Sequence, residues 1–171
     1  VAIGAHKSQK MGIEGEDKAG VLSGVDLLRE VALGNPPDFH GLRVGVGGGG
    51  NFATDAARTA WRLGASQVHV IYRRRRQDMP AYKEEVEATE AEEAQFHFLT
   101  NPGRILGEGH VTGVECLKQA LGEYARSGRR RPNPIAGSEF VIGLDVLISA
   151  IGQEPDQSWM SSGEEITLQR G

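Results

Sequence analysis

The feature that most restricts the fold of this chain is a glycine-rich turn between a predicted strand and a predicted helix. Residues 42–46 form a short apolar run, and residues 53–63 place alanine and leucine at helical spacing. Between these segments the chain follows the pattern Gly48-x-Gly50-x-x-Ala53. In such a turn the first glycine permits a tight bend, the second lets the backbone approach a pyrophosphate, and the small third residue keeps the helix close to the strand. The pattern therefore predicts a Rossmann-like dinucleotide-binding unit.

The segments after the turn predict a three-layer α/β fold. β-branched residues at 67–72 supply a second strand and complete one right-handed βαβ unit. A helix is expected to begin at residues 79–81, and a third strand at 96–99 is expected to end at Asn101-Pro102-Gly103. Beyond residue 104, short apolar runs separated by turns predict an antiparallel β-meander that covers a parallel sheet with its helices, followed by a final buried strand at 145–151.

The first part of the chain contributes a loop and one more helix. Residues 8–22 are polar and rich in glycine, which predicts a loop. Apolar residues at helical spacing predict a helix over residues 24–33, which Gly34 and the two prolines after it would end.

The turn and the start of its helix supply the candidate dinucleotide-binding residues, which are Gly48, Gly49, Gly50, Asn51, Phe52 and Ala53. The first N–H groups of a helix have no partner within the helix, and the helix dipole is positive at this end. Phosphate groups bind well at such a position. We therefore expect the pyrophosphate of a dinucleotide there.

The end of the second strand predicts which dinucleotide is bound. An NAD-specific site carries Asp or Glu here, because a carboxylate accepts hydrogen bonds from the ribose hydroxyls. In this chain Arg73 and Arg74 occupy that place, 23 residues beyond Gly50. Guanidinium groups bind a 2′-phosphate through paired, charge-assisted hydrogen bonds. The prediction is NADPH rather than NADH; the alternative is a basic loop that serves solubility.

Composition and charge exclude several other classes of protein. The net charge of −4 argues against a nucleic acid or an anionic membrane as a partner. The run Arg129-Arg130-Arg131 is accordingly interpreted as solvated charge in a hairpin loop. No stretch reaches the roughly 18 apolar residues of a membrane-spanning helix, and the N-terminal residues lack the order of a signal peptide. With a single cysteine, we expect a cytoplasmic protein.

The sequence offers no candidate catalytic residue and no metal site. The five histidines are scattered without metal-ligand spacing, and His69 and His97 alternate with apolar residues, so their side chains are expected to point away from the core. Cys116 is predicted to be a small core residue. Hydride transfer needs an acceptor beside the nicotinamide ring, and no group of this chain is one.

Three segments, taken in order, resemble the NADPH-binding part of the glutamate synthase small (beta) subunit and related flavoproteins. They are residues 44–60 around the turn, Tyr72-Arg73-Arg74 followed by Met79-Pro80-Ala81, and Ala150-Ile151-Gly152-Gln153 with Pro155-Asp156. The resemblance covers nearly the whole chain. It departs from the family pattern at Gly47, where a branched residue is usual, and in lacking the flavin fingerprint, the cysteine-rich region and the C-terminal flavin motif.

The resemblance implies a role for this chain in electron transfer. NADPH delivers hydride to FAD in that family, and the electrons pass to iron–sulfur clusters and a large electron-accepting subunit. FAD and the clusters are therefore expected only in parts outside these 171 residues. The resemblance assigns the 2′-phosphate to Arg73 and Arg74, with Arg76 added to them. It places Ala150, Ile151 and Gly152 near the nicotinamide half.

The resemblance also implies a domain organisation, in which this chain is the NADPH-binding domain of a longer flavoprotein. Residues 1–22 would be the connection from a flavin domain, residues 23–152 the NAD(P)H-binding domain, and residues 153–171 the return connection. Two other functions remain open from the sequence. One is a non-catalytic module that senses NADPH and regulates a protein partner, and the other is a structural α/β domain that binds no nucleotide.

Overall fold

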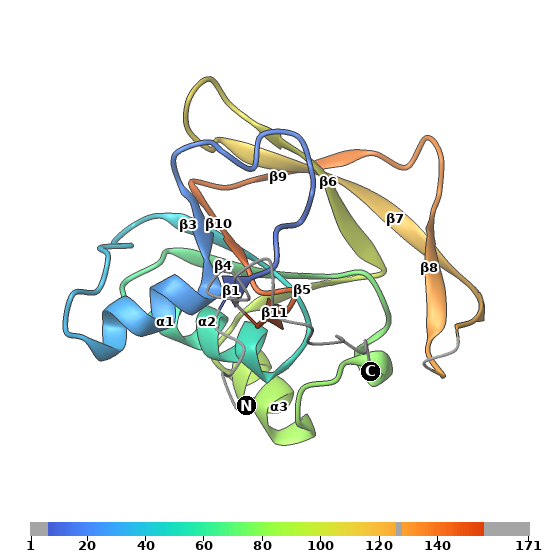
Figure 1. Ribbon diagram of the computed structural model, residues 1–171, viewed down its shortest axis with the longest axis horizontal. Helices are drawn as coiled ribbons and strands as arrows, with labels where there is room; N and C mark the ends of the chain where they lie inside the picture. Colours follow the sequence, from blue (N-terminus) through green and yellow to red (C-terminus); the bar gives the residue numbers. More distant parts are fainter. Residues whose placement is uncertain (1–6, 126–127, 156–171) are drawn as a thin grey trace, which may run out of the picture.

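The computed structural model describes residues 7–125 and 128–155, which form three stacked layers (Figure 1). A parallel β-sheet lies in the middle. Helices cover one face of this sheet, in the lower part of Figure 1, and an antiparallel sheet covers the other face, in the upper part. The predicted three-layer Rossmann-like fold is therefore confirmed.

The central sheet consists of five parallel strands in the spatial order β2-β10-β3-β4-β5. Their bounds are Val21–Ser23 for β2, Arg43–Gly47 for β3, Gln67–Tyr72 for β4, Gln95–Phe98 for β5 and Val146–Ser149 for β10. Because the strands are parallel, their carboxyl ends meet at one edge of the sheet. The turn after β3 thus lies between the segments that follow β4 and β10.

Three α-helices cover one face of the parallel sheet. They are α1 (Gly24–Ala32), α2 (Asn51–Arg62) and α3 (Lys83–Ala91), and a single 3-10 turn, η1 (Arg76–Asp78), precedes α3. Small residues on α2 let it lie close to the sheet, where Ala53, Ala56, Ala57 and Ala60 are buried in one cluster with the valines of β3 and β4. The longest helix of the described residues, α2, has 12 residues, and none of these helices is long and apolar enough to cross a membrane.

The antiparallel layer is built around the long strand β7. It contains β6 (Thr100–Leu106), β7 (Gly113–Tyr124), β8 (Arg130–Pro134) and β9 (Phe140–Gly143). The first half of β7 pairs with β6 and β9, whereas its second half pairs with β8 alone and forms a hairpin. Cys116 is buried between this layer and the parallel sheet, as predicted, and burial raises the pKa of its thiol to about 12. A short pair, β1 (Lys7–Ser8) with β11 (Gln153–Glu154), completes the structure.

Some predicted boundaries of the elements are wrong. The residues predicted as a loop over 8–22 include Val21 and Leu22, which pair with β10 as an edge strand. The predicted turn at 101–103 lies inside β6, where a bulge between Pro102 and Arg104 absorbs the irregular residues. The run 129–131 is not all solvated loop, because Arg130 and Arg131 begin β8.

The helix predicted to begin at residues 79–81 begins instead at Lys83. The N–H of Ala81 donates to the carbonyl of Gly49 (3.2 Å), and the N–H of Tyr82 donates to the Asn51 side chain (2.7 Å). These hydrogen bonds hold the segment around Pro80 against the glycine turn, which keeps it out of the helix.

The expectation for the two strand histidines is also wrong. His69 is buried on the sheet face that carries the antiparallel layer, and its Nδ1 lies 3.0 Å from Nε2 of His97. One imidazole therefore donates a hydrogen bond to the other. Burial lowers the pKa of His69 to about 4 and also lowers the pKa of His97, so both rings are neutral at pH 7. No third metal-ligating residue joins them among the described residues.

A two-fold hydrogen-bonded ion pair ties the start of β3 to the start of β10. The guanidinium of Arg43 donates to both carboxylate oxygens of Asp145, at 3.0 and 2.8 Å, and the Arg43 backbone N–H donates to the same carboxylate at 2.9 Å. The Asp145 N–H donates in return to the Arg43 carbonyl. These bonds hold the pKa of Asp145 down at about 2.

We expect Asp145→Asn to lower the free energy of unfolding at pH 7 by about 1 kcal/mol, a value reduced because the pair is partly exposed to solvent. A carboxyl group whose pKa is lowered by folding stabilises the folded state when the pH is above its unfolded pKa of about 3.9. This stabilisation is lost as the pH falls toward the pKa of the folded state. The difference between the two proteins, measured by urea unfolding, should therefore shrink between about pH 5 and about pH 2. A difference that stays constant over this range would contradict the assigned role of the pair.

Candidate functional site

A cavity of about 760 Å³ opens at the carboxyl edge of the parallel sheet. It is lined by the turn after β3, by the segments after β4 and β10, by the N-terminal segment, and by parts of the antiparallel layer. The lining residues are Gln9, Met11, Ile13, Gly47, Gly48, Gly49, Gly50, Asn51, Phe52, Ile71, Tyr72, Arg73, Arg74, Pro80, Asn101, Pro102, Arg129, Ala150, Ile151, Gly152 and Gln153. In open α/β sheets ligands bind at this edge, where the strand order reverses.

The first two glycines of the turn are required by packing. The backbone φ of Gly48 is +152°, and a Cβ there would stand 2.3 Å from the carbonyl oxygen of Ala150. A Cβ at Gly49 would stand 2.4 Å from the ring of Tyr72. Any side chain at either position therefore displaces backbone or a buried ring. Ala53 does not line the cavity; it packs beneath Gly48 and keeps α2 close to β3.

Gly50 differs from the other two, because nothing in the fold requires it to be glycine. Its φ of −90° suits any residue, and a Cβ there would have only Pro80 as a neighbour, at 3.9 Å. The missing side chain leaves open space in front of the first turn of α2. No side chain caps that helix start, so its first N–H groups face the cavity without a side-chain acceptor. An anion that approaches Gly50 would meet these donors and the positive end of the helix dipole.

The four consecutive arginines after β4 separate into two pairs. Arg75 donates to Asp78, at 2.9 and 3.2 Å, and Arg76 donates to Glu90, at 2.8 and 2.7 Å. Arg73 and Arg74 belong to none of the ion pairs of the described residues, and both line the cavity. Arg76, which was predicted to bind the 2′-phosphate, does not line the cavity, because Glu90 of α3 holds its guanidinium.

The cavity is bounded on the opposite side by the residues that follow β10. The Ala150 N–H donates to the Gly47 carbonyl at 2.8 Å, and the Gln9 N–H donates to the Gly152 carbonyl at 3.0 Å. Ile151 is 45% exposed, so its backbone and side chain are accessible from the cavity mouth. The segment Ala150-Ile151-Gly152 and the glycine turn thus line the same cavity. The role predicted for this segment, near the nicotinamide half of the nucleotide, requires that proximity.

Several residues of the cavity lie in segments whose sequence predicts no binding role. Met11 and Ile13 lie in a segment predicted as loop, and Asn101 and Pro102 in a segment predicted as a turn. Arg129 differs most from its prediction, since the sequence predicts that its run of three arginines is solvated charge in a loop. A tertiary contact, the hydrogen bond from the Arg74 side chain to the Arg130 carbonyl, brings the Arg129 hairpin to the cavity that Arg73 and Arg74 line.

The chemistry available in the cavity suits the binding of an anionic small molecule. Its volume falls in the range of about 300–1,000 Å³ that is typical of small-molecule sites. It offers an open helix N-terminus, an apolar part, and three arginines, Arg73, Arg74 and Arg129, that form none of the ion pairs of the described residues. Among the lining residues there is no His, Cys, Asp, Glu or Lys that would act as acid, base or nucleophile.

Comparison with known proteins identifies the family. The model for the pyridine nucleotide-disulphide oxidoreductase family matches residues 1–171. The chain belongs to this family. A solved structure also resembles this chain, namely the FprA oxidoreductase of Mycobacterium tuberculosis in complex with NADPH. The two superpose with a TM-score of 0.74 and are 19% identical in sequence. The match covers 89% of this chain and 49% of FprA. At that level of identity the likeness supports the fold alone.

Relatives in sequence come from several oxidoreductases. The chain is 49% identical over 165 residues to the NADPH-Fe(3+) oxidoreductase subunit beta of Geobacter sulfurreducens, and 45% identical over 169 residues to the NADP(+)-dependent formate dehydrogenase subunit beta of Moorella thermoacetica. These matches cover 94% and 97% of this chain but only 24% of either relative. The small chain of the NADPH glutamate synthase of Halomonas elongata is 37% identical over 164 residues, 91% of this chain and 35% of the relative, which confirms the predicted resemblance.

The two kinds of glycine in the turn can be separated by substitution. We expect Gly48→Ala to lower the free energy of unfolding by at least about 2 kcal/mol, because its Cβ meets the Ala150 backbone. Gly50→Ala should cost less than about 1 kcal/mol, since its Cβ has room. The two variants are matched, because each changes the unfolded chain in the same way. Equal losses in chemical unfolding would contradict the described packing of the turn.

Proposed function

We propose that this chain binds NADPH in the cavity at the carboxyl edge of its parallel sheet and presents the nicotinamide to a flavin of the same enzyme. The observation that carries the proposal is the coincidence of an open helix N-terminus with Arg73 and Arg74 in one cavity. The first suits a pyrophosphate and the second suits a 2′-phosphate. NADH has only the first of these two groups, so the combination favours NADPH.

Each part of the proposed site has a distinct task. The backbone of Gly48, Gly49 and Gly50, with the first N–H groups of Asn51 and Phe52, would hold the pyrophosphate, while Ala53 keeps the helix in place. Arg73 and Arg74 would pair with the 2′-phosphate. Arg74 is already positioned for this task, because its Nε donates to the Arg130 carbonyl at 2.9 Å and its terminal amino groups stay available.

The segment Ala150-Ile151-Gly152 would support the nicotinamide half. Its backbone is hydrogen-bonded to Gly47 and to Gln9, which hold it beside the glycine turn. When bound, NADPH supplies a hydride, and the acceptor must lie in another part of the enzyme. The proposed task of this chain is then to bind and orient the nucleotide.

The electron acceptors belong to the proposal as well. We propose FAD as the direct acceptor in a flavin domain connected to residues 1–22 and 153–171, with iron–sulfur clusters and a large electron-accepting subunit beyond it. The relatives from Geobacter and Moorella are each named as a beta subunit, which supports a partner subunit. The single cysteine suits the reducing cytoplasm. The alternative of an NADPH-sensing regulator receives no support from the family match or from these relatives.

Replacing Arg73 and Arg74 together by Ala should raise the Kd for NADPH about a hundredfold and that for NADH less than about threefold, because two charge-assisted contacts to the 2′-phosphate are lost. Isothermal titration calorimetry of both nucleotides measures this difference. Arg76→Ala is the matched control, since Arg76 is also an arginine of this run but is paired with Glu90. Equal weakening of NADPH and NADH, or an equal effect of Arg76→Ala, would contradict the proposal.

Gly50→Ala should weaken NADPH and NADH to the same extent, by about tenfold or more, because its Cβ enters the space proposed for the pyrophosphate that both nucleotides share. The same calorimetric titrations give the result. If the variant folds and binds both nucleotides as the unmodified chain does, the pyrophosphate does not lie at Gly50.

A further inference from the structure

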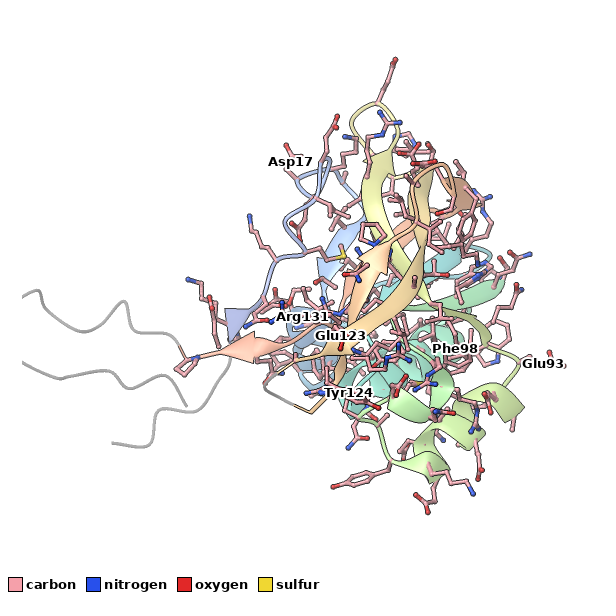
Figure 2. The ribbon with its side chains drawn as sticks, turned by 90° about the vertical axis from the view of Figure 1, so that its right-hand side faces the viewer. Asp17, Glu93, Phe98, Glu123, Tyr124 and Arg131 are labelled. Atoms are coloured by element: carbon pink, nitrogen blue, oxygen red, sulfur yellow. The ribbon has the colours of Figure 1, made fainter. Side chains whose placement is uncertain are left out.

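Arg129 lies at the cavity although it is distant in sequence from the other basic residues there. It belongs to the hairpin that joins β7 to β8, and it lines the same cavity as Arg73 and Arg74. Figure 2 shows this hairpin on the side that faces the viewer, with Glu123 and Tyr124 on β7 and Arg131 on β8. The hairpin therefore reaches beyond the face of the parallel sheet and forms one wall of the site.

The hairpin is attached to β4 at the residue beside Arg129. The Arg74 Nε donates to the carbonyl of Arg130 at 2.9 Å. The guanidinium of Arg130 turns back and donates to the carbonyls of Gly122 and Leu121, at 2.8 and 2.5 Å. The Arg129 carbonyl accepts from the Ala125 N–H at 2.8 Å. The backbone of Arg129 is thus fixed relative to Arg74, while its side chain is exposed.

The charges around Arg129 are unbalanced. Among the described residues six arginines form ion pairs with carboxylates, namely Arg43, Arg58, Arg62, Arg75, Arg76 and Arg104. None of those pairs includes Arg73, Arg74 or Arg129. Burial lowers the pKa of Arg73, and the positive charges of Arg74 and Arg129 lower it further, so both of these neighbours repel Arg73. In a chain of net charge −4, such a cluster is relieved by a bound anion.

We propose that Arg129 is a third ligand of the 2′-phosphate, so that the β7–β8 hairpin, and not β4 alone, determines the preference for NADPH. This inference rests on the proposed function and extends it. A phosphate dianion bound by Arg73, Arg74 and Arg129 together would offset the repulsion that Arg74 and Arg129 exert on Arg73.

The test compares Arg129→Ala with Arg131→Ala in calorimetric titrations of this chain with NADPH, NADH and 2′,5′-ADP. Arg131 is an exposed arginine of the same hairpin that does not line the cavity, so it controls for charge. Arg129→Ala should raise the Kd for NADPH and for 2′,5′-ADP about tenfold and leave that for NADH within about twofold. Arg131→Ala should leave all three within about twofold. Arg129→Gln, which keeps most of the apolar stem, serves if the alanine variant unfolds at a lower temperature.

The outcomes separate this inference from the function on which it rests. If the unmodified chain does not prefer NADPH to NADH, or if replacing Arg73 and Arg74 leaves that preference unchanged, the proposed function fails. If those arginines matter and Arg129→Ala has no selective effect, only the role of Arg129 is overturned. Equal effects of the Arg129 and Arg131 variants would also overturn it, since they would indicate general attraction by charge.

Discussion

The turn after β3 and the backbone after β10 touch so closely that the oxygen of Ala150 lies where a side chain on Gly48 would stand. This contact joins two parallel neighbours whose residues are far apart in the chain. At the opposite end of the same two strands, the Arg43–Asp145 ion pair joins residues separated by 102 positions. Contacts therefore join both ends of this pair of strands, and the glycine turn, the start of α2 and the segment 150–152 all line the cavity.

The second feature that shapes the site is that only two of the four arginines after β4 are paired with carboxylates of the described residues. Asp78 and Glu90 take up the charges of Arg75 and Arg76, which directs those side chains along η1 and α3. Arg73 and Arg74 have no such partner among the described residues and are left at the cavity. A run of four basic residues is thereby divided into a structural half and a half available for an anion. The acidic helix α3 thus holds Arg76 through Glu90 without itself reaching the cavity.

Much of the fold could be predicted because its signals are local. The glycine pattern, the alanine-rich helix after it and the β-branched strand at 67–72 each follow from short-range propensity, and their order implies a βαβ unit. The meander and the buried Cys116 were likewise predicted correctly. The errors arise where tertiary pairing prevails over local signals. Val21 and Leu22 form a strand only because β10 is beside them, and Pro80 is held outside α3 by hydrogen bonds to the glycine turn.

The site was predicted in part for the same reason. Gly48 to Ala53 and Arg73-Arg74 lie on adjacent elements of one unit, so their proximity follows from that unit. Arg129 comes from a hairpin whose path depends on the second half of β7, and nothing local distinguishes it from Arg131. Similarly, the contact between His69 and His97 depends on the parallel register of β4 and β5, which no spacing in the sequence reveals.

The central claim is that the 2′-phosphate of NADPH lies among guanidinium groups at this cavity, and phosphorus NMR tests it most directly. The resonance of the 2′-phosphate would be followed with pH for free NADPH and for NADPH saturated with the chain. A free phosphate monoester loses its second proton near a pKa of about 6. Because nearby cations favour the dianion, we expect the pKa of the bound 2′-phosphate to fall by about one unit or more. A bound 2′-phosphate that titrates with the same pKa as free NADPH would contradict the claim.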